Sequence, residues 1–279
     1  MPKDPSGPQI RLVALDLDGT SLDSGGRLRD STKRAVAAAR ARGVTVVVVT
    51  GRHHVLTRPL HAEFALDTPA ICCNGTYVYD FAAERPVLGE PMAKDAARRM
   101  IALCRRHGVH VLLYVRDAMT FEVSTPHLDG LQAWAATFPE PMRPRLVEVE
   151  SFEATIAAAP LVWKVVVSSD DGDALAAWHA EAATLPGFNI ESSWTNRWDV
   201  MIAGASKGPR LLEWAATRGI APEEILAFGD NLNDVSMIAS VGWGVAMGNA
   251  AEGLKQVADE VIGSNDGDDI AATMARILG

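Results

Sequence analysis

The stretch Ile10-Arg-Leu-Val-Ala-Leu-Asp16-Leu-Asp18-Gly-Thr20 decides the fold and places the chemistry. Its first six residues are largely apolar and predict a buried strand, after which two carboxylates precede a glycine that turns the chain. Side chains two residues apart in an extended chain point the same way, so Asp16 and Asp18 share one small space. Two neighbouring carboxylates need a cation or a shared proton. In an open α/β sheet, ligands bind outside the carboxyl ends of the strands, where this pair is expected.

Strand and helix alternate on both sides of a central segment of different character. Continuous β-branched runs such as 44–49 are typical of strands buried on both faces, and their alternation with helices predicts a parallel sheet with right-handed crossovers. The strands expected in these flanking parts are 10–15, 44–49, 70–73, 225–228, 244–247 and 260–262. The expected helices are one through Ala41 that Asp30 or Ser31 can cap, then 54–64, 207–218, 251–258 and one at the C-terminus.

The central segment carries hairpin-like strand pairs with intervening helices, which predicts an α+β insert with an antiparallel sheet. We therefore expect an α/β fold: a doubly wound parallel-sheet core at residues 1–85 and 202–279, and an inserted α+β cap domain at residues 86–201. The substrate site is expected in the cleft between them.

Composition limits the possible partners. The chain has 279 residues, of which 48% are hydrophobic and 22% are charged, a globular balance, and its net charge of −9 argues against broad contact with nucleic acid. The longest apolar runs are too short to cross a bilayer, and residues 1–9 form a polar, Pro-rich lead-in without a secretory signal. Three cysteines, an odd number, fit a reducing compartment, and Cys72 and Cys73 are expected to be buried thiols. We expect a cytoplasmic protein that acts on a small molecule, with no nucleic acid or membrane partner. Its oligomeric state is open.

Three further polar signals fall at expected strand ends or helix starts. Thr50-Gly-Arg52 follows a strand and offers a hydroxyl, a permissive backbone and a cation. Lys207-Gly208 follows Ser206, the expected cap of a helix, and places a cation where it can reach a phosphate. Gly229-Asp230-Asn-Leu-Asn233-Asp234 ends another strand with acids and amides. Oxygen ligands without a His or Cys cluster favour Mg²⁺ over zinc, and together these residues predict metal-assisted phosphoryl transfer.

These four motifs resemble those of the haloacid-dehalogenase (HAD) superfamily of phosphatases, and in particular its Cof-type branch of sugar- and cofactor-phosphate hydrolases. Two further strings are similar to that branch, Asn74-Gly-Thr76 and Ala246-Met-Gly-Asn-Ala250. Only about thirty residues separate Asp18 from Thr50, too few to hold a cap domain. The cap is therefore expected between the second and third motifs, which is the placement of the Cof-type branch.

The resemblance implies a role for each motif residue. Asp16 is implied to be the nucleophile that forms an aspartyl phosphate, and Asp18 the general acid and then the general base. Mg²⁺ is implied to be held by the Asp16 carboxylate, the Asp18 backbone carbonyl and Asp230, with Asp234 in support. Contacts to the phosphoryl group or substrate are implied at Leu17, Thr50, Gly51, Arg52, Asn74, Lys207 and Asn233, and Lys207 is also counted as catalytic. Such a set is needed because a carboxylate attacks a dianion only where cations and aimed donors offset the repulsion.

Other interpretations stay open at the level of the sequence. A phosphomutase similar to phosphomannomutase would need a cap that grips both ends of a sugar bisphosphate. A signalling module that stores an aspartyl phosphate would lack an acid/base at Asp18. Hexose phosphates, pyridoxal phosphate, flavin mononucleotide and short sugar phosphates are all possible substrates, and the role of the Asn265–Asp269 loop is open. His53 and His54 are expected at the surface, at the start of a helix.

Overall fold

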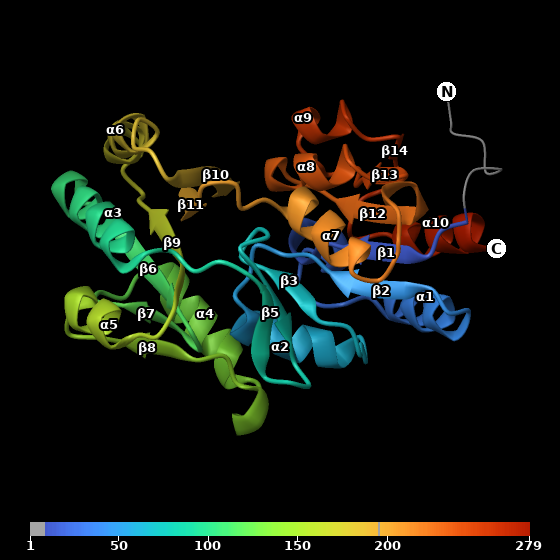
Figure 1. The fold of residues 1–279 in the computed structure, drawn as a ribbon, viewed down its shortest axis with the longest axis horizontal. Coiled ribbons are helices and arrows are strands. Elements are labelled where there is room, and N and C mark those ends of the chain that lie inside the picture. The colour runs from blue at the N-terminus through green and yellow to red at the C-terminus, as the bar shows by residue number, and fades with distance from the viewer. Residues whose placement is uncertain (1–8, 195) are drawn as a thin grey trace. The chain divides into compact units, whose positions relative to one another are not determined.

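The computed structural model describes residues 9–194 and 196–279, which form two compact units (Figure 1). The first unit contains residues up to Gly51, Leu60–Gly89 and Ser206–Gly279, and the second contains Arg52–Pro59 and Glu90–Ala205. The chain passes between the two units after Gly89 and again after Ala205, whereas the predicted domain boundaries fall after residues 85 and 201. The expected N-terminal lead-in, except for Gln9, lies outside the described residues.

The first unit is built on a five-stranded parallel sheet in the order β14-β13-β12-β1-β2. Its strands are β1 (Leu12–Leu15), β2 (Thr45–Val48), β12 (Ile225–Gly229), β13 (Trp243–Ala246) and β14 (Glu260–Val261). Its helices are α1 (Asp30–Ala41), α7 (Lys207–Ala216), α8 (Val235–Ile238), α9 (Glu252–Lys255) and α10 (Asp269–Leu278), while α2 (His54–Glu63) begins in the second unit and ends in the first. The predicted doubly wound parallel core is confirmed.

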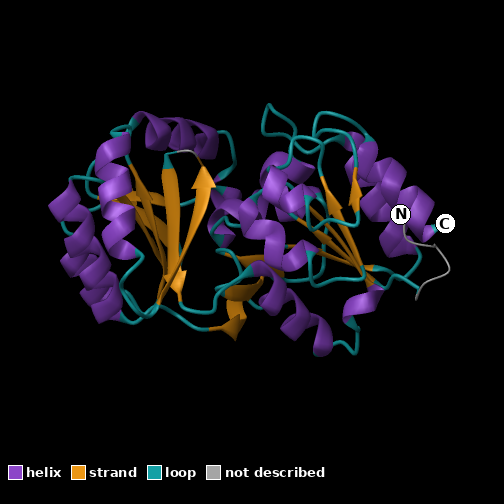
Figure 2. Cartoon of the chain, turned by 90° about the horizontal axis from the view of Figure 1, so that it is seen from above, coloured by secondary structure: helices purple, strands orange, loops and turns teal. Residues whose placement is uncertain are grey.

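Helices cover both faces of this sheet (Figure 2), which explains the continuous apolar strands. Alternate strand residues such as Leu12 and Val47 pack with Leu211 and Trp214 of α7 in one apolar cluster. The opposite face is covered by α1 and α10, which contact each other and bury apolar residues of their own, among them Val36. Each fully buried aliphatic side chain contributes about 1.5–3 kcal/mol.

The strand register sets the position of the polar residues that follow. Leu15 at the end of β1 pairs with Val48 of β2 on one side and with Phe228 of β12 on the other. Because the three strands are parallel and in step, the segments that follow them all leave the sheet at the same edge. This edge therefore carries Asp16, Thr50 and Asp230.

A small antiparallel sheet extends this edge. It consists of β3 (Ala70–Cys72), β4 (Tyr77–Asp80) and β5 (Arg85–Gly89), and a parallel bridge between Val49 and Ile71 joins it to the chain after β2. The sequence predicted β3 and its buried thiols but not the hairpin of β4 and β5. The turn from Cys73 to Gly75 has three consecutive positive φ angles of 50°, 53° and 84°. A Cβ at position 75 would lie 2.1 Å from the backbone oxygen of Ser206, so a glycine lets this turn approach the start of α7.

The second unit holds a six-stranded sheet in the order β10-β11-β9-β6-β7-β8, antiparallel except for the β7–β8 pair. Its strands are β6 (His110–Val115), β7 (Ala118–Phe121), β8 (Leu146–Glu148), β9 (Val162–Ser168), β10 (Phe188–Trp194) and β11 (Arg197–Ile202). Its helices are α3 (Lys94–His107), α4 (Pro126–Ala136), α5 (Phe152–Ala158) and α6 (Gly172–Ala182). Residues of α3, α5 and α6 share one apolar cluster with the strands, so these helices pack on one face of the sheet. The predicted α+β character of this segment is confirmed.

Within residues 9–194 and 196–279, no helix combines the length and the hydropathy needed to span a bilayer.

Candidate active site

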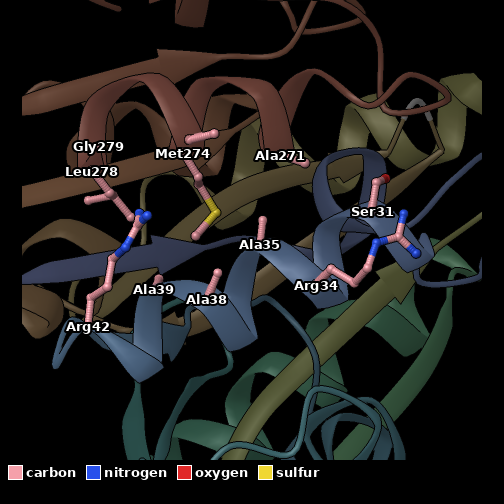
Figure 3. Close-up of a pocket in the computed structure, with 11 residues that line it drawn as sticks. Ser31, Arg34, Ala35, Ala38, Ala39, Arg42, Ala271, Met274, Leu278 and Gly279 are labelled. Atoms are coloured by element: carbon pink, nitrogen blue, oxygen red, sulfur yellow. The ribbon is translucent and has the colours of Figure 1, made fainter.

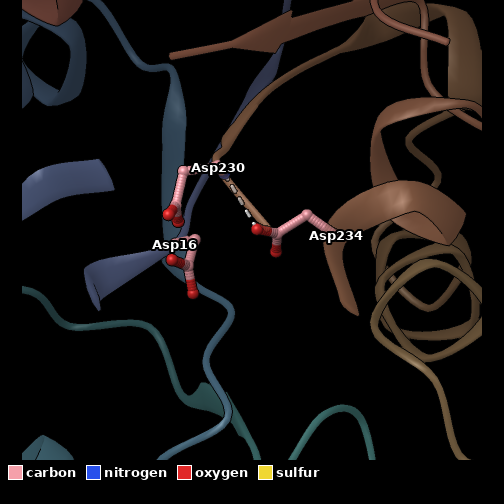
Figure 4. A group of neighbouring side chains, drawn as sticks. All are labelled: Asp16, Asp230 and Asp234. Carbon is pink, nitrogen blue, oxygen red and sulfur yellow. Dashed lines mark hydrogen bonds between the residues drawn. The ribbon is translucent and has the colours of Figure 1, made fainter. Parts of the chain in front are cut away.

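Three buried charged side chains, those of Asp16, Lys207 and Asp234, meet the partly buried Asp230 at the edge of the parallel sheet. Lys207 Nζ donates to Asp16 Oδ1 over 2.7 Å and to Asp234 Oδ1 over 2.5 Å. Asp230 completes the group, since one carboxylate oxygen each of Asp16, Asp230 and Asp234 lie within 4.8 Å of one another (Figure 4). Lys207 thus pairs with two of the three carboxylates, and Asp230 adds a third negative charge, so this group of described residues carries more negative than positive charge.

The electrostatics of this group follow from burial and crowding. Burial raises the pKa of Asp16 well above its ordinary value, and the neighbouring Lys207 ammonium opposes only part of that effect. Burial, followed by the charge of Asp234, raises the pKa of Asp230 to about 7. Burial alone would lower the pKa of Lys207, but the charges of Asp16 and Asp234 outweigh it and raise that pKa. The acids therefore need one further cation before all of them can be ionised.

A divalent metal ion fits this requirement. The donor atoms are carboxylate oxygens, the ligands that Mg²⁺ prefers, and within the described part of the chain no histidine or cysteine joins the group. Asp234 differs from the other two acids because both its oxygens already have partners. Its Oδ2 accepts from the backbone N–H groups of Asp230 and Asn231 over 3.0 and 3.1 Å, and its Oδ1 accepts from Lys207. This arrangement suits a side chain that orients the Asp230 loop and the lysine.

The loop after β1 is shaped to approach Asp230. Gly19 has φ +76°, and a Cβ there would lie 2.2 Å from Asp230 Oδ2, so only a glycine fits. The next residue, Thr20, donates its hydroxyl to Asp230 Oδ1 over 3.0 Å. Asp18 is exposed and lies outside the buried acid group, but its charge still raises the pKa of Asp230. Asp18 is thus placed at the rim of the site.

The segment after β2 packs against the β3–β4 turn. The Thr50 N–H donates to Ile71 O over 2.8 Å, and the Asn74 N–H donates to Thr50 O over 3.1 Å. A Cβ at Gly51 would lie 2.7 Å from Asn74 Oδ1, and that oxygen accepts from Asn233 Nδ2 over 3.0 Å. Residues from three motifs are therefore brought into one hydrogen-bonded group in the first unit.

The start of α7 is held against α8. Ser206 precedes the helix as predicted, but its hydroxyl forms no cap; it lies 2.5 Å from the hydroxyl of Ser236. Ser236 Oγ also accepts from the Gly208 N–H over 3.1 Å, and a Cβ at Gly208 would lie 2.2 Å from Ser236 O. The expected capping bond is wrong, because the hydroxyl finds a partner on a neighbouring helix. The effect is to fix the helix turn that carries Lys207.

The predicted site residues fall into three groups. The structure brings Asp16, Thr50, Gly51, Asn74, Lys207, Asp230, Asn233 and Asp234 together, with Leu17 fully buried beside Asp16 in the chain. Asp18 lies at the rim. Arg52 belongs to the second unit, where its guanidinium group lies 5.4 Å from the centre of the Trp134 ring.

Sequence reasoning assigned no role to two asparagines that shape the loop after β1. Asn249 Nδ2 donates to Gly19 O over 2.8 Å, and Asn249 Oδ1 accepts from the Asn265 N–H over 3.0 Å. Asn265 Nδ2 in turn donates to Leu22 O over 2.8 Å. The Asn265–Asp269 loop, whose role was open, thus supports the Asp18-Gly19 turn. The sequence signal for Asn249 is its place in the Ala246–Ala250 string that is similar to the Cof-type branch.

The histidines at the start of α2 correct another prediction. His53 and His54 are 0% and 2% exposed, whereas both were expected at the surface. Both belong to the second unit, where His53 Nε2 lies 2.8 Å from the backbone oxygen of Val115.

A groove between α1 and α10 lies elsewhere on the first unit (Figure 3). Small and apolar side chains such as Ala35 and Met274 form most of its lining, flanked by Arg34 and Arg42. It contains none of the predicted site residues, and we assign no function to it.

Comparison with known proteins agrees with this geometry. Residues 13–274 match the model of a family described as haloacid dehalogenase-like hydrolase. The pyridoxal phosphate phosphatase YbhA of Escherichia coli (strain K12) is 42% identical over 261 residues, which cover 94% of this chain and 96% of YbhA. The 5-amino-6-(5-phospho-D-ribitylamino)uracil phosphatase YcsE of Bacillus subtilis (strain 168) is 28% identical over 266 residues, 94% of this chain and 93% of YcsE.

Solved structures give the same result. A haloacid dehalogenase-like hydrolase from Bacteroides thetaiotaomicron superposes with a TM-score of 0.84 at 25% identity, covering 96% of this chain and 100% of that one. One from B. subtilis superposes with a TM-score of 0.85, also at 25% identity and with the same coverage. The chain belongs to the haloacid dehalogenase-like hydrolases, and within them to the Cof-type branch. It is an enzyme of the phosphoric monoester hydrolase class.

Proposed function

We propose that this protein is a Mg²⁺-dependent phosphatase that hydrolyses small phosphomonoesters through an aspartyl phosphate on Asp16. The observation that carries the proposal is the Asp16 carboxylate at a strand end, 2.7 Å from the buried Lys207 ammonium and grouped with two further acids. Such a carboxylate is oriented by one cation and can share a second with the two neighbouring acids, and attack on a phosphate dianion requires such charge neutralisation.

The proposed reaction has two steps. First, an Asp16 oxygen forms a bond to phosphorus while the bond from phosphorus to the substrate oxygen breaks, and Asp18 gives that oxygen its proton. Second, a water attacks the phosphorus of the aspartyl phosphate, Asp18 takes the proton of the water, and the bond between phosphorus and Asp16 breaks. Inorganic phosphate and the free Asp16 carboxylate result. The exposed position of Asp18 supports this role, because the proton must pass to and from the substrate and solvent.

The metal and the phosphoryl contacts are assigned to the motif residues. Mg²⁺ would be held by the Asp16 carboxylate, the Asp18 carbonyl and Asp230, with Asp234 in support, and it would supply charge neutralisation at the phosphoryl oxygens. Contacts to the phosphoryl group or substrate are assigned to Leu17, Thr50, Gly51, Arg52, Asn74, Lys207 and Asn233. The hydrogen bonds that hold Thr50, Asn74 and Asn233 together support the idea that they act on one ligand.

Among possible substrates we place pyridoxal phosphate first. The 42% identity to a pyridoxal phosphate phosphatase over nearly the whole chain supports this choice. Sugar phosphates and other phosphorylated cofactors follow, since a relative at 28% identity acts on a phosphoribitylaminouracil.

The test is phosphate release from a panel of phosphomonoesters that includes pyridoxal phosphate, hexose phosphates and flavin mononucleotide. The panel is run with Mg²⁺, with EDTA, and with the Asp16→Asn variant beside the wild-type protein. We expect Mg²⁺-dependent release that the variant lacks, with pyridoxal phosphate as the preferred compound. Release that persists in EDTA or in the variant would reject the metal or the covalent mechanism. Turnover that needs a bisphosphate activator and frees little phosphate would point to a mutase.

A further inference from the structure

The turn that follows β13 contacts the segment that carries Asp230. β13 lies beside β12 in the parallel sheet, and the Met247 N–H, directly after β13, donates to Gly229 O at the end of β12 over 3.0 Å. Further along the same turn, the Ala251 N–H donates to Asp230 O over 2.8 Å. Two backbone hydrogen bonds therefore join the turn of residues 247–251 to the Asp230 segment.

The same turn also reaches the loop after β1, through the side chain of Asn249. Its Nδ2 donates to Gly19 O over 2.8 Å, and its Oδ1 accepts from the Asn265 N–H over 3.0 Å. A carbonyl can only accept and a backbone N–H can only donate, so one orientation of the carboxamide satisfies both partners. Asn249 thus joins the loop after β1 to the turn that contacts Asp230.

The bond to Gly19 falls where the two loops are closest. A Cβ at Gly19 would lie 2.2 Å from Asp230 Oδ2, and the Thr20 hydroxyl donates to Asp230 Oδ1 over 3.0 Å. The nitrogen of Gly19 is bonded to the carbonyl carbon of Asp18. A shift of Gly19 relative to Asp230 therefore changes the distance between the Asp18 carbonyl and the Asp230 carboxylate.

Asn265 supports this arrangement from the other side. Its backbone N–H holds Asn249 Oδ1, and its Nδ2 donates to Leu22 O over 2.8 Å. The Leu22 N–H donates in turn to Leu17 O over 2.9 Å, which closes the loop after β1. The two asparagines thus bind this loop at two carbonyls, one in its middle and one at its end.

We infer that Asn249, supported by Asn265, is a positioning residue for the metal ligands. It sets the spacing between the Asp18 carbonyl and the Asp230 carboxylate by holding Gly19. The inference rests on the proposed function, in which these two groups hold Mg²⁺. Groups that orient metal ligands typically change metal affinity by about 10- to 100-fold when they are removed. Asn249 is exposed and acts through the residue next to Asp18, so we expect the lower end of that range.

Three substitutions test the role of the asparagines. Asn249→Ala removes the bonds to Gly19 and to the Asn265 N–H. Asn265→Ala removes the bond to Leu22 but keeps the backbone N–H that orients Asn249. Asn189→Ala is the matched control, because Asn189 Nδ2 donates to Ala205 O over 2.7 Å within the second unit, so the same change removes the same kind of bond there.

Three quantities are measured for each protein. They are the dissociation constant of Mg²⁺ from the metal-free protein by titration calorimetry, the Mg²⁺ concentration for half-maximal activity with pyridoxal phosphate, and the melting temperature in EDTA. We expect Asn249→Ala to raise both Mg²⁺ constants by about 10-fold. Saturating Mg²⁺ should restore much of kcat, because the bound ion then draws its two ligands together. Asn265→Ala should raise the constants by a smaller factor, and Asn189→Ala should lower only the melting temperature.

Two results would overturn the inference. One is an Asn249→Ala protein that binds Mg²⁺ as tightly as the wild type or, should that variant not fold, an Asn265→Ala protein that does so. The other is an equal loss of Mg²⁺ affinity in Asn189→Ala, which would show a general effect of lower stability. A wild-type protein that binds no Mg²⁺ would instead refute the metal in the proposed function, so the two failures are distinguishable.

Discussion

Replacing Lys207 with methionine should destabilise the metal-free protein and do so more strongly as the pH rises. The ammonium group bonds Asp16 at 2.7 Å and Asp234 at 2.5 Å, and the three side chains are 1%, 5% and 0% exposed. Removing one partner of a buried ion pair costs about 3–5 kcal/mol, because the other charge is left uncompensated. At roughly 2–4 °C per kcal/mol, the melting temperature should fall by about 6–20 °C.

The sign of the pH dependence follows from the carboxylates. The pKa of Asp16 is already raised in the folded protein by burial, and loss of Lys207 removes the charge that opposes this effect. An acid whose folded pKa is raised stabilises the fold while it is protonated, and this contribution is lost as the pH rises through the folded pKa. The Lys207→Met penalty should therefore be larger at pH 8 than at pH 5.5.

The assay is thermal unfolding of both proteins in EDTA at these two pH values. Lys255→Met is the matched control, since the same substitution removes a half-exposed ion pair with Glu252 at 3.0 Å and should cost less than about 1 kcal/mol. A Lys207→Met protein as stable as the control, or equally destabilised at both pH values, would refute the reasoning.

The remaining predictions concern the ion pair of the second unit, the metal and a glycine. Lys164→Met should lower the free energy of unfolding in urea by about 3–5 kcal/mol, because the charge of Asp199 stays buried after its Lys164 partner is removed. The Lys164→Met/Asp199→Leu double variant should recover most of this loss, and no recovery would contradict the prediction. Mg²⁺ should raise the melting temperature more at pH 8 than at pH 6. The pKa of Asp230 is raised to about 7, so its carboxyl group is more fully ionised at pH 8 and binds the cation better there. An equal rise at both pH values would argue against a metal at this acid. Gly208→Ala should lower kcat/KM by about 10²-fold, since its Cβ would lie 2.2 Å from Ser236 O, and wild-type kinetics would show that the helix start adjusts freely.

The sequence predicted the parallel sheet and the edge at which the polar residues meet. A continuous β-branched run such as 44–49 is typical of a strand buried on both faces. Acids that directly follow such parallel strands lie at the carboxyl edge of the sheet. The acid group was predictable for this reason, and so was its need for a cation.

The buried polar contacts of the second unit were not predictable. His53 bonds a backbone carbonyl 62 residues away. Every residue has such a carbonyl, so the sequence does not show which one a histidine contacts. Lys164 bonds Asp199, which is 35 residues away on a strand that was not predicted. Nothing in the sequence therefore indicated a buried lysine at position 164. Similarly, the hydroxyl of Ser206 was assigned to its own helix because its partner, Ser236, is distant in the chain.

The central claim is that Asp16 carries the phosphoryl group during turnover, and mass analysis of a trapped enzyme tests it most directly. The Asp18→Asn variant, which lacks the base for the second step, is mixed with pyridoxal phosphate and Mg²⁺, quenched in acid and digested. The account predicts one added phosphoryl group on the peptide that contains Asp16, absent from the Asp16→Asn variant. A phosphoryl group on another residue, or none while Asp18→Asn still releases phosphate, would contradict it.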